Sequence, residues 1–421
     1  MAQRRGPERG EKAVLVGLSL GGRHRERTLE SVEELGLLAE SAGARVAATL
    51  VQERSRPDPA TLIGRGKVKE LAAACEAAGA DLVVFDDDLS PAQQRNLEEA
   101  VDCKTVDRTQ LILDIFALRA RTREGRLQVE LAQLDYMLPR LAGKGILLSR
   151  LGGGIGTRGP GETKLETDRR RIRQRIAQVR REIASVRRER HTRREARARG
   201  EAPVVALVGY TNAGKSTLFN ALTRGGAAVS DRLFMTLDPL VRKVRLGGGR
   251  DLLLVDTVGF IQKLPHSLVA AFRATLEEVV EADLLLHVVD ASAPAVEERE
   301  AAVLAVLKEI GADERPQLLV LNKSDLAPAA RCAALAQGRD AAVVVSALSG
   351  AGLPALLDTI AARVDLVARR VRLRFDAAES RAIASVYAVG RVLEHLTEGG
   401  CVTLDAELPV RALARYRERL A

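Results

Sequence analysis

The 421-residue sequence predicts an α/β protein made of several domains. Apolar runs of strand length alternate with helical patterns, which is typical of parallel sheets with helical crossovers. A glycine-rich G-x-x-x-x-G-K-[ST] motif lies between one apolar run and a helix. Two further segments carry apolar residues about every 3.5 positions, the spacing of paired helices. We expect domains at residues 1–120, 121–200, 201–366 and 367–421, the first and third being α/β, the second a helical hairpin and the fourth α+β.

Composition limits the class of protein. Apolar residues make up 46% of the chain, which is enough to form hydrophobic cores, while aromatic residues make up only 3%. No run approaches the roughly 20 apolar residues of a membrane span, and no apolar signal-peptide core follows the basic N-terminus. Four cysteines lie far apart without metal-binding spacing, which indicates reduced thiols. We therefore expect a cytoplasmic, monomeric protein with no membrane span.

The first domain should be a mostly parallel sheet. Helical patterns cover residues 29–42 and 67–78, and Ser90-Pro91 is a typical helix start. The segment Ile63–Lys67 resembles half a phosphate loop, so it is either a second nucleotide site or a tight turn that starts a helix. Three aspartates at 86–88 indicate either a metal site or a solvated turn. The expected strands are Ala13–Leu20, Arg45–Val51, Asp81–Phe85 and Lys104–Val106.

The sequence of the second domain predicts an antiparallel helical hairpin with a glycine-rich tip. Apolar residues recur at spacings of 4 and 3 from Leu127 to Leu141 and again from Ile172 to Val186. Residues 143–161 between them hold eight glycines and no acidic residue. Residues 162–199 hold fifteen Lys or Arg against six acids, an excess that equals the net charge of +9 of the whole chain. Positive charge so localised is typical of a nucleic-acid contact, the alternative being a solvated helix face. The candidate RNA-binding residues are Lys144, Arg150, Arg158, Lys164, Arg169, Arg170 and Arg173.

The glycine-rich motif of the third domain predicts a phosphate-binding loop. An apolar run from Val204 to Val208 precedes it, and a helical pattern follows Lys215. A strand that turns through glycine into a helix points several backbone N–H groups at one polyphosphate. Lys215 is placed to reach the terminal phosphates, and the Ser216 hydroxyl to ligate Mg²⁺. The expected nucleotide-binding residues are Gly209, Tyr210, Thr211, Asn212, Ala213, Gly214, Lys215, Ser216 and Thr217.

Three further motifs follow in order, each at the end of an apolar run: D-x-x-G, N-K-x-D and Ser346-Ala347-Leu348, the last of which ends the run Ala342–Val345. A D-x-x-G motif ends the run Leu252–Val255 and suits the neighbourhood of Mg²⁺ and the γ-phosphate. An N-K-x-D motif ends the run Leu318–Leu321, and its last carboxylate is placed to accept two hydrogen bonds from guanine, which adenine cannot offer. In this order the motifs predict an enzyme that binds GTP and GDP and hydrolyses GTP. The expected switch II residues are Asp256, Thr257, Val258 and Gly259, and the expected guanine-binding residues are Asn322, Lys323, Asp325, Ser346, Ala347 and Leu348.

The first switch is expected at Gly225–Pro239 and includes Phe234, Met235 and Thr236. Thr236 is the expected second Mg²⁺ ligand beside Ser216. Phe260 follows the D-x-x-G motif where many GTPases carry a glutamine that orients water, so we expect slow intrinsic turnover. The last domain, with strands expected at 371–375 and 401–404 and helices at 379–395 and 410–420, carries no chemical motif and is expected to be a docking module.

Several segments closely resemble the HflX family of GTPases, from about residue 11 to the end of the third domain. They include IGRGKVKEL, VVFDDDLSPAQQRNLE, GGGIGTRGPGETKLETDRRRIRQRI and GYTNAGKSTLFNAL. The resemblance implies a GTPase that binds the large ribosomal subunit and its RNA and helps to split stalled or idle ribosomes. In related GTPases with G-x-x-N-x-G-K-S the asparagine helps to bind K⁺, so Asn212 is a candidate K⁺ ligand. Two alternatives stay open, an RNA-remodelling NTPase with an ATP site in the first domain and a GTP-dependent switch that binds another protein.

Overall fold

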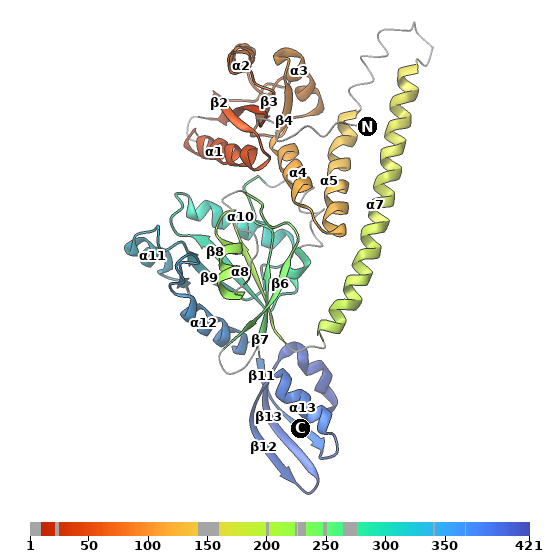
Figure 1. The fold of residues 1–421 in the computed structure, drawn as a ribbon, viewed down its shortest axis with the longest axis vertical. Helices are drawn as coiled ribbons and strands as arrows, with labels where there is room; N and C mark the ends of the chain where they lie inside the picture. Colours follow the sequence, from red (N-terminus) through yellow and green to blue (C-terminus); the bar gives the residue numbers. More distant parts are fainter. Residues whose placement is uncertain are drawn as a thin grey trace. The chain divides into compact units, whose positions relative to one another are not determined.

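The computed structural model describes residues 10–21, 25–141, 160–198, 202–223, 225, 233–246, 251–263, 276–339, 342–366 and 368–421 (Figure 1). The chain forms two compact units. The first contains Met1–Ala184, Ser230–Leu237 and Gln262–Phe272, and the second contains Ser185–Val229, Asp238–Ile261 and Arg273–Ala421. No helix among the described residues is long and apolar enough to cross a membrane.

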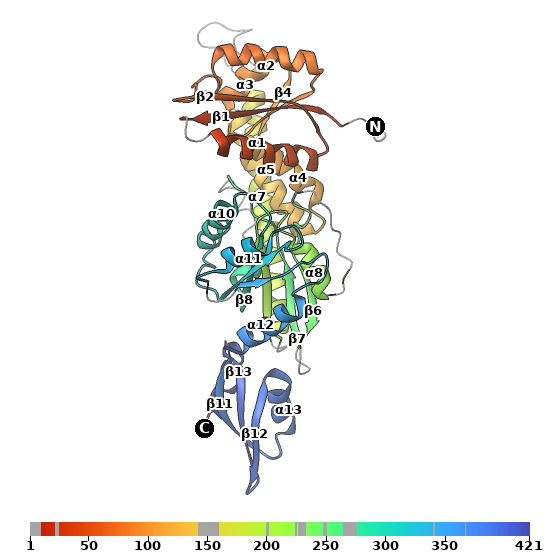
Figure 2. The same cartoon turned by 90° about the vertical axis from the view of Figure 1, so that its left-hand side faces the viewer.

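The first unit is built on a four-stranded sheet in the order β2-β1-β3-β4, and all its pairs are parallel. The prediction of a parallel α/β region is therefore confirmed. Figure 2 shows this sheet between two helical layers, with α2 and α3 on one face and α1 on the other. A capping box at Ser90 starts α3, because its hydroxyl accepts from the Gln93 N–H while the Gln93 side chain accepts from Ser90. The elements are β1 (Lys12–Leu20), α1 (Arg25–Ser41), β2 (Arg45–Arg54), α2 (Arg65–Ala78), β3 (Leu82–Phe85), α3 (Pro91–Val101), β4 (Lys104–Asp107) and α4 (Arg108–Arg119).

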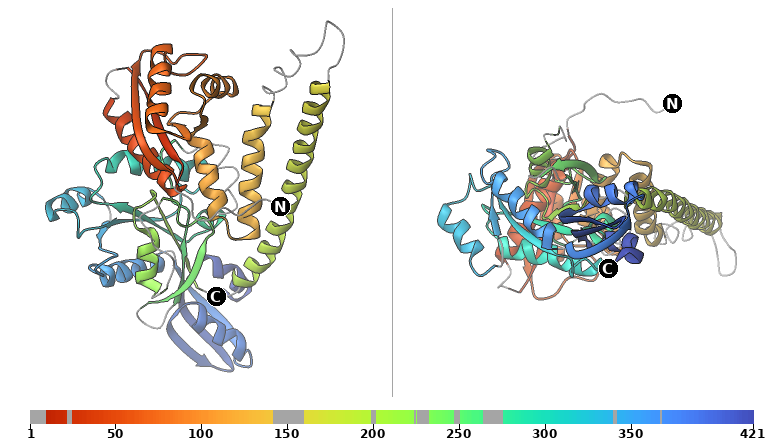
Figure 3. Two further views of the ribbon diagram at one scale, coloured as in Figure 1. Left: turned by 45° about the horizontal axis from the view of Figure 1, so that its top comes forward. Right: turned by 90° about the horizontal axis from the view of Figure 1, so that it is seen from below.

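Two long helices follow, α5 (Arg123–Leu141) and α7 (Pro160–Ala198). Figure 3 shows α5 beside α7, and the part of α7 up to Ala184 belongs to the same unit as α5. Ile176, Val179 and Ile183 of the predicted seam are buried. Arg175 of α7 forms a bidentate ion pair with Glu130 of α5. Its Nε and Nη2 atoms lie 2.6 and 2.8 Å from the two carboxylate oxygens of Glu130. The expected glycine-rich tip lies mostly outside the described residues.

The second unit contains a six-stranded sheet in the order β10-β9-β8-β5-β7-β6. All pairs are parallel except β6 with β7, which is antiparallel. The four expected strand runs lie in β5, β7, β9 and β10, and β8 (Leu284–Asp290) contains the buried His287. Its other elements are β5 (Val204–Gly209), α8 (Lys215–Thr223), β6 (Leu240–Arg245), β7 (Asp251–Asp256), α10 (Val296–Glu309), β9 (Gln317–Asn322), α11 (Ala329–Ala336), β10 (Ala342–Val344) and α12 (Leu353–Leu366).

The end of the chain is a small antiparallel sheet in the order β11-β13-β12. Its strands are β11 (Ala368–Asp376), β12 (Arg391–Glu398) and β13 (Cys401–Pro409). Helix α13 (Ser380–Val389) packs on one face, where Val386 joins a cluster with Leu373 and Leu404. One prediction is wrong here: the helix expected at 379–395 ends at Val389, and the chain continues as β12. The helix expected at 410–420 is present as a 3₁₀ helix over Val410–Arg419, which packs Tyr416 into the same cluster.

Candidate functional site

The phosphate-binding loop follows β5 directly and leads into α8. Two glycines in it adopt a backbone that other residues rarely reach, with φ of 150° at Gly209 and 89° at Gly214. A Cβ at Gly209 would collide with the carbonyl oxygen of Val288, and one at Gly214 would collide with the amide of Asn322. Both positions therefore require glycine for conformation and for space. The result is a tight loop whose backbone passes closely over β8 and β9.

Lys215 begins α8 and is 6% exposed. Its amine donates to the carbonyl oxygens of Gly209, at 3.0 Å, and Tyr210, at 2.8 Å. Burial lowers the pKa of Lys215 to about 8, and the nearby carboxylate of Asp256 only partly offsets this effect. The amine is thus held over the loop by carbonyl groups, where an incoming phosphate would restore its full charge.

Ser216 and Asp256 meet at the carboxyl ends of β5 and β7. The Ser216 hydroxyl donates to Asp256 Oδ2 at 2.7 Å, and the Asp256 side chain is fully buried. Next to it, the Thr257 hydroxyl donates to the Leu207 carbonyl at 2.5 Å, which fixes the start of the D-x-x-G segment against β5. A hydroxyl and a buried carboxylate in contact are hard oxygen donors of the kind that Mg²⁺ prefers. The chemistry of these two residues therefore fits Mg²⁺, while Thr236 belongs to the other unit and stays a predicted ligand.

The D-x-x-G segment is tied to the phosphate loop by its backbone. The Phe260 N–H donates to the Gly209 carbonyl at 3.1 Å, and the Thr211 N–H donates to the Phe260 carbonyl at 2.6 Å. A Cβ at Gly259 would lie 2.8 Å from Thr211 Cα and 3.0 Å from Lys215 Nζ. Phe260 itself is buried and 1% exposed, so its ring faces the protein interior. A movement of Gly259 would therefore displace the phosphate loop through these contacts.

The N-K-x-D segment extends the same loop toward a base site. Asn322 donates from Nδ2 to the Ala213 carbonyl at 2.9 Å and accepts the Ala347 N–H at Oδ1, at 3.0 Å. Asp325 accepts the Ser346 hydroxyl at Oδ1, at 2.6 Å, which orients its carboxylate. The structure thus brings five of the six predicted guanine-binding residues together, Lys323 being paired with Asp290 at 2.7 Å. The sixth, Leu348, is 83% exposed.

The remaining predicted residues of this region lie around the loop. Asn212 is exposed and adopts a left-handed backbone with φ of 59°, and Thr217 is half-buried in the first turn of α8. Met235 is half-buried and Phe234 is buried, both in the first compact unit.

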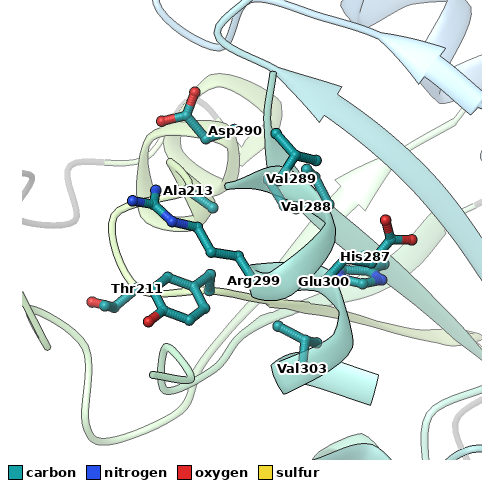
Figure 4. Close-up of a pocket in the computed structure, with 11 residues that line it drawn as sticks. Thr211, Ala213, His287, Val288, Val289, Asp290, Arg299, Glu300 and Val303 are labelled. Carbon is teal, nitrogen blue, oxygen red and sulfur yellow. The ribbon is translucent and has the colours of Figure 1, made fainter. Parts of the chain in front are cut away.

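A small cavity of ≈ 10 Å³ lies behind the phosphate loop, between β8 and α10 (Figure 4). His287 lines it, is 3% exposed, and has no hydrogen-bond partner at Nε2 in the part of the chain that the structure describes. Burial lowers the pKa of His287 to about 4, so its ring is neutral at physiological pH. Tyr210 stacks under the Arg299 guanidinium at 5.4 Å. Nothing in the sequence indicated this contact, because α10 carries no motif.

Two segments of the first domain were candidate sites, the turn Ile63–Lys67 and the aspartates at 86–88. In both, the polar groups bind other residues of the protein. The Gly64 N–H donates to the Gln52 side chain at 2.8 Å, and Lys67 pairs with Glu70 at 2.8 Å. The Lys263 amine forms ion pairs with the carboxylates of Asp86 and Asp87, with N–O distances of 2.5 and 2.8 Å. Nothing in these contacts favours a second nucleotide site or a metal there.

The predicted RNA-binding residues fall partly within the described chain. Arg170 and Arg173 are exposed on α7 and Arg169 is half-buried. Lys164 lies in α7, while Lys144, Arg150 and Arg158 lie outside the described residues.

The fold and this ordered set of motifs define a P-loop GTPase, an enzyme that hydrolyses GTP. Three family models match consecutive parts of the chain. They are the GTP-binding GTPase N-terminal domain over residues 29–117, the GTP-binding GTPase middle region over 119–197 and the 50S ribosome-binding GTPase over 204–323. The chain belongs to the HflX family of GTPases.

Two relatives illustrate the family membership. GTPase HflX of Caldanaerobacter subterraneus subsp. tengcongensis is 46% identical over 407 residues, covering 97% of this chain and 93% of the relative. GTPase HflX of Escherichia coli K12 is 44% identical over 404 residues, 95% of this chain and 94% of the relative. A crystal structure of a GTP-binding protein from the archaeon Sulfolobus solfataricus with GDP is also similar. It is 25% identical with a TM-score of 0.45, and covers 84% of this chain and 98% of that chain.

Proposed function

We propose that this GTPase binds the large ribosomal subunit and couples GTP binding and hydrolysis to the splitting or recycling of stalled or idle ribosomes. The observation that carries the proposal is the basic α7 helix, packed on α5 in a chain of the HflX family. The family model that matches the GTPase domain describes 50S ribosome-binding GTPases, which supports the choice of partner.

The surface of the two helices suits the backbone of an RNA. A groove of ≈ 570 Å³ runs between them, and its lining includes Asp135 and Leu138 of α5. From α7 it is lined by Arg173, Arg180 and Arg181, which are all exposed. Of these, Arg180 lies 3.6 Å from Asp135. Guanidinium groups along a groove contact phosphates without reading bases, so binding should depend on RNA shape and salt.

The nucleotide site of the proposal uses the residues already described. Lys215 and the backbone of residues 209–217 hold the phosphates, and Asp325 reads guanine. Ser216 and Thr236 would hold Mg²⁺, with Asp256 accepting a hydrogen bond from Ser216, and the ion would supply positive charge that stabilises the transferred phosphoryl group. Water attacks the γ-phosphorus in line, while Lys215 and the Gly259 N–H hold the transferred group.

Asn212 is proposed as a K⁺ ligand, because its exposed amide sits on a left-handed turn beside the phosphate loop. A cation there would place positive charge beside the phosphates, which the apolar side chain of Phe260 cannot do. Equal GTPase rates in potassium and sodium buffers, measured with and without ribosomes, would rule the proposal out.

The decisive experiment is co-sedimentation of the protein with purified ribosomal subunits, with GDP and with a non-hydrolysable GTP analogue. We expect binding to the large subunit that is stronger with the GTP analogue. The matched variants are Arg170→Glu with Arg173→Glu on α7, and Lys308→Glu, an exposed lysine of α10, as the control.

The α7 double variant should lose subunit binding at moderate salt and keep its nucleotide affinity, while the control should keep both. Co-sedimentation unchanged by the double variant would contradict the role of α7. Absence of ribosome binding by the wild-type protein would favour the switch that binds another protein.

A further inference from the structure

Cys75 and Cys103 are distant in the sequence but meet beside the N-terminal sheet. Cys75 lies near the end of α2, and Cys103 lies between the end of α3 and the start of β4. Cys75 belongs to the hydrophobic cluster on this face of the sheet, and Cys103 packs against the same cluster. The two thiols are in contact and hydrogen-bond to each other. The fold therefore creates a pair of thiols that the spacing of the cysteines does not reveal.

Backbone contacts hold the two cysteines in this arrangement. The Ala80 N–H donates to the Cys75 carbonyl at 2.9 Å, and the Cys103 thiol donates to the Ala80 carbonyl at 3.3 Å. Gly79 ends α2 in a left-handed conformation with φ of 58°, and Asp102 ends α3 in the same way with φ of 52°. Strands β3 and β4 pair in parallel directly after these two turns. Ala80 thus links the backbone of one cysteine to the side chain of the other.

The two thiols differ in exposure. Cys75 is 2% exposed, whereas Cys103 is half-buried. Burial, reinforced by the neighbouring Cys103, raises the pKa of the Cys75 thiol to about 12. Cys75 therefore keeps its proton at physiological pH, and Cys103 is the more accessible of the two thiols to a dissolved oxidant.

Metal binding is the other chemistry open to two adjacent thiols. A structural zinc ion takes further ligands besides two thiolates. Among the residues that the structure describes, no group of three or more His, Cys, Asp or Glu side chains is placed to hold a metal ion. Two thiols in contact suit oxidation instead, because a thiol next to a sulfenic acid condenses with it to a disulfide.

We propose that Cys75 and Cys103 form a peroxide-reactive dithiol, which hydrogen peroxide converts to an intramolecular disulfide and thiol reductants restore. The Cys103 sulfur first attacks one peroxide oxygen, the O–O bond breaks, and the leaving hydroxide takes the Cys103 proton as water. The Cys75 sulfur then attacks the sulfur of this Cys103 sulfenic acid, the S–O bond breaks, and the leaving hydroxide takes the Cys75 proton as water. The two thiols lose two electrons in total, which reduce one peroxide to two waters.

The disulfide would tie the end of α2 to the start of β4. It would enclose β3 and α3 in a covalent loop, which lowers the entropy of the unfolded chain and so stabilises the N-terminal sheet. It would also protect Cys103, because a sulfenic acid without a neighbouring thiol is oxidised further and irreversibly. The inference does not depend on the proposed function, since neither cysteine belongs to the nucleotide site.

The test treats the reduced full-length protein with hydrogen peroxide and digests it with trypsin without reduction. Trypsin cuts after Arg95, between the two cysteines, and after Lys69 and Lys104 on either side. The disulfide therefore appears as one species that joins peptides 70–95 and 96–104, and dithiothreitol separates them. We expect this joined species in the wild type and equally in Cys401→Ser, the control that removes the other half-buried thiol.

Two variants separate the roles of the paired thiols. Cys75→Ala keeps a small apolar side chain in the cluster; the joined peptides should disappear, and dimedone should label Cys103 as a sulfenic acid. In Cys103→Ser, whose hydroxyl can still donate to Ala80, Cys75 should stay reduced. The oxidised wild type should unfold at a higher temperature than the reduced protein, and both variants should lose this difference. Unchanged GDP binding in each variant shows that the chain is folded.

Conversion of Cys103 to a sulfinic acid in the wild type, without the joined peptides, would overturn the inference. So would a disulfide that links two molecules instead, or oxidation of Cys75 in Cys103→Ser at the wild-type rate. A pair that stays reduced at peroxide concentrations that oxidise Cys401 would overturn it as well.

Discussion

The hydroxyl of Ser216 donates to Oδ2 of Asp256 at 2.7 Å, so a residue that begins helix α8 is joined to the end of strand β7. The two side chains come from segments forty positions apart and meet where the parallel strands of the sheet end. This contact holds two hard oxygen donors at one point.

Removal of the Ser216 hydroxyl tests this point. Ser216→Ala should leave the fold intact, because Ser216 is only half-buried, and should lower GTP hydrolysis about 10²–10³-fold through loss of a metal ligand. The rate should be measured over a range of Mg²⁺ concentrations, and the variant should need more Mg²⁺ than the wild type. Wild-type Mg²⁺ dependence in this variant would exclude Ser216 as a ligand.

The pKa of Lys215 predicts a pH dependence of nucleotide binding. In the free protein burial lowers this pKa from 10.5 to about 8, and bound phosphates should raise it again. Between about pH 8 and 10.5 binding therefore takes up a proton, and the affinity for GDP should fall as pH rises. Calorimetry at pH 8.5 in buffers of different ionisation enthalpy measures the uptake directly, and Lys215→Arg should abolish it.

The lowered pKa of Lys215 also affects the stability of the protein without nucleotide, which should increase as pH rises. The unfolded chain binds the Lys215 proton more tightly than the folded chain, so this group alone makes folding more favourable as pH rises from about 8 to 10.5. Lys215→Met should remove that contribution, which a comparison of unfolding free energies at pH 7 and 9.5 would reveal.

Asp325→Asn should change the base that the enzyme prefers. The Ser346 hydroxyl donates to Asp325 Oδ1 at 2.6 Å, so an asparagine should place its oxygen there and turn its NH₂ toward the base. That NH₂ opposes the N–H donors of guanine and suits the carbonyl of xanthine. We expect guanine affinity to drop about 100-fold or more relative to xanthine, measured by competition between GDP and XDP. Retained guanine preference would refute the role of Asp325.

Gly259→Ala should disturb the contact between switch II and the phosphate loop. The added Cβ would lie 2.8 Å from Thr211 Cα and 3.0 Å from Lys215 Nζ, closer than carbon and nitrogen atoms pack. Overpacking of this kind costs about 1–3 kcal/mol, which should appear in the unfolding free energy and in weaker GTP binding. Gly66→Ala is the matched control, because a Cβ there meets nothing within 4 Å and α2 should be unaffected or slightly stabilised.

The meeting of the strand ends at the candidate nucleotide site could be predicted from the sequence, because each motif is local. Each motif follows an apolar run, and parallel strands bring their carboxyl ends to one edge, so Gly209, Asp256 and Asn322 had to converge. The ion pair between Lys263 and Asp86 joins positions 177 apart and depends on the tertiary fold, so no spacing rule could reveal it.

The errors also have physical reasons. Strand β12 carries apolar residues at Val392, Leu393 and Leu396, a spacing that also suits a helix, so the preceding helix seemed to continue. Gly390 was the local sign of its end, because a Cβ there would collide with the Glu407 carbonyl. Strand β6 was not predicted because three of its six residues are basic, which gives this edge strand a largely polar appearance.

The carboxamide of Asn322 joins the Ala213 carbonyl on one side to the Ala347 N–H on the other. One planar group therefore links the segment proposed to bind the phosphates to the segment proposed to bind the guanine base. A shorter or charged replacement at this position would loosen both ends of the bound nucleotide at once, so discrimination between bases and retention of the diphosphate should deteriorate together.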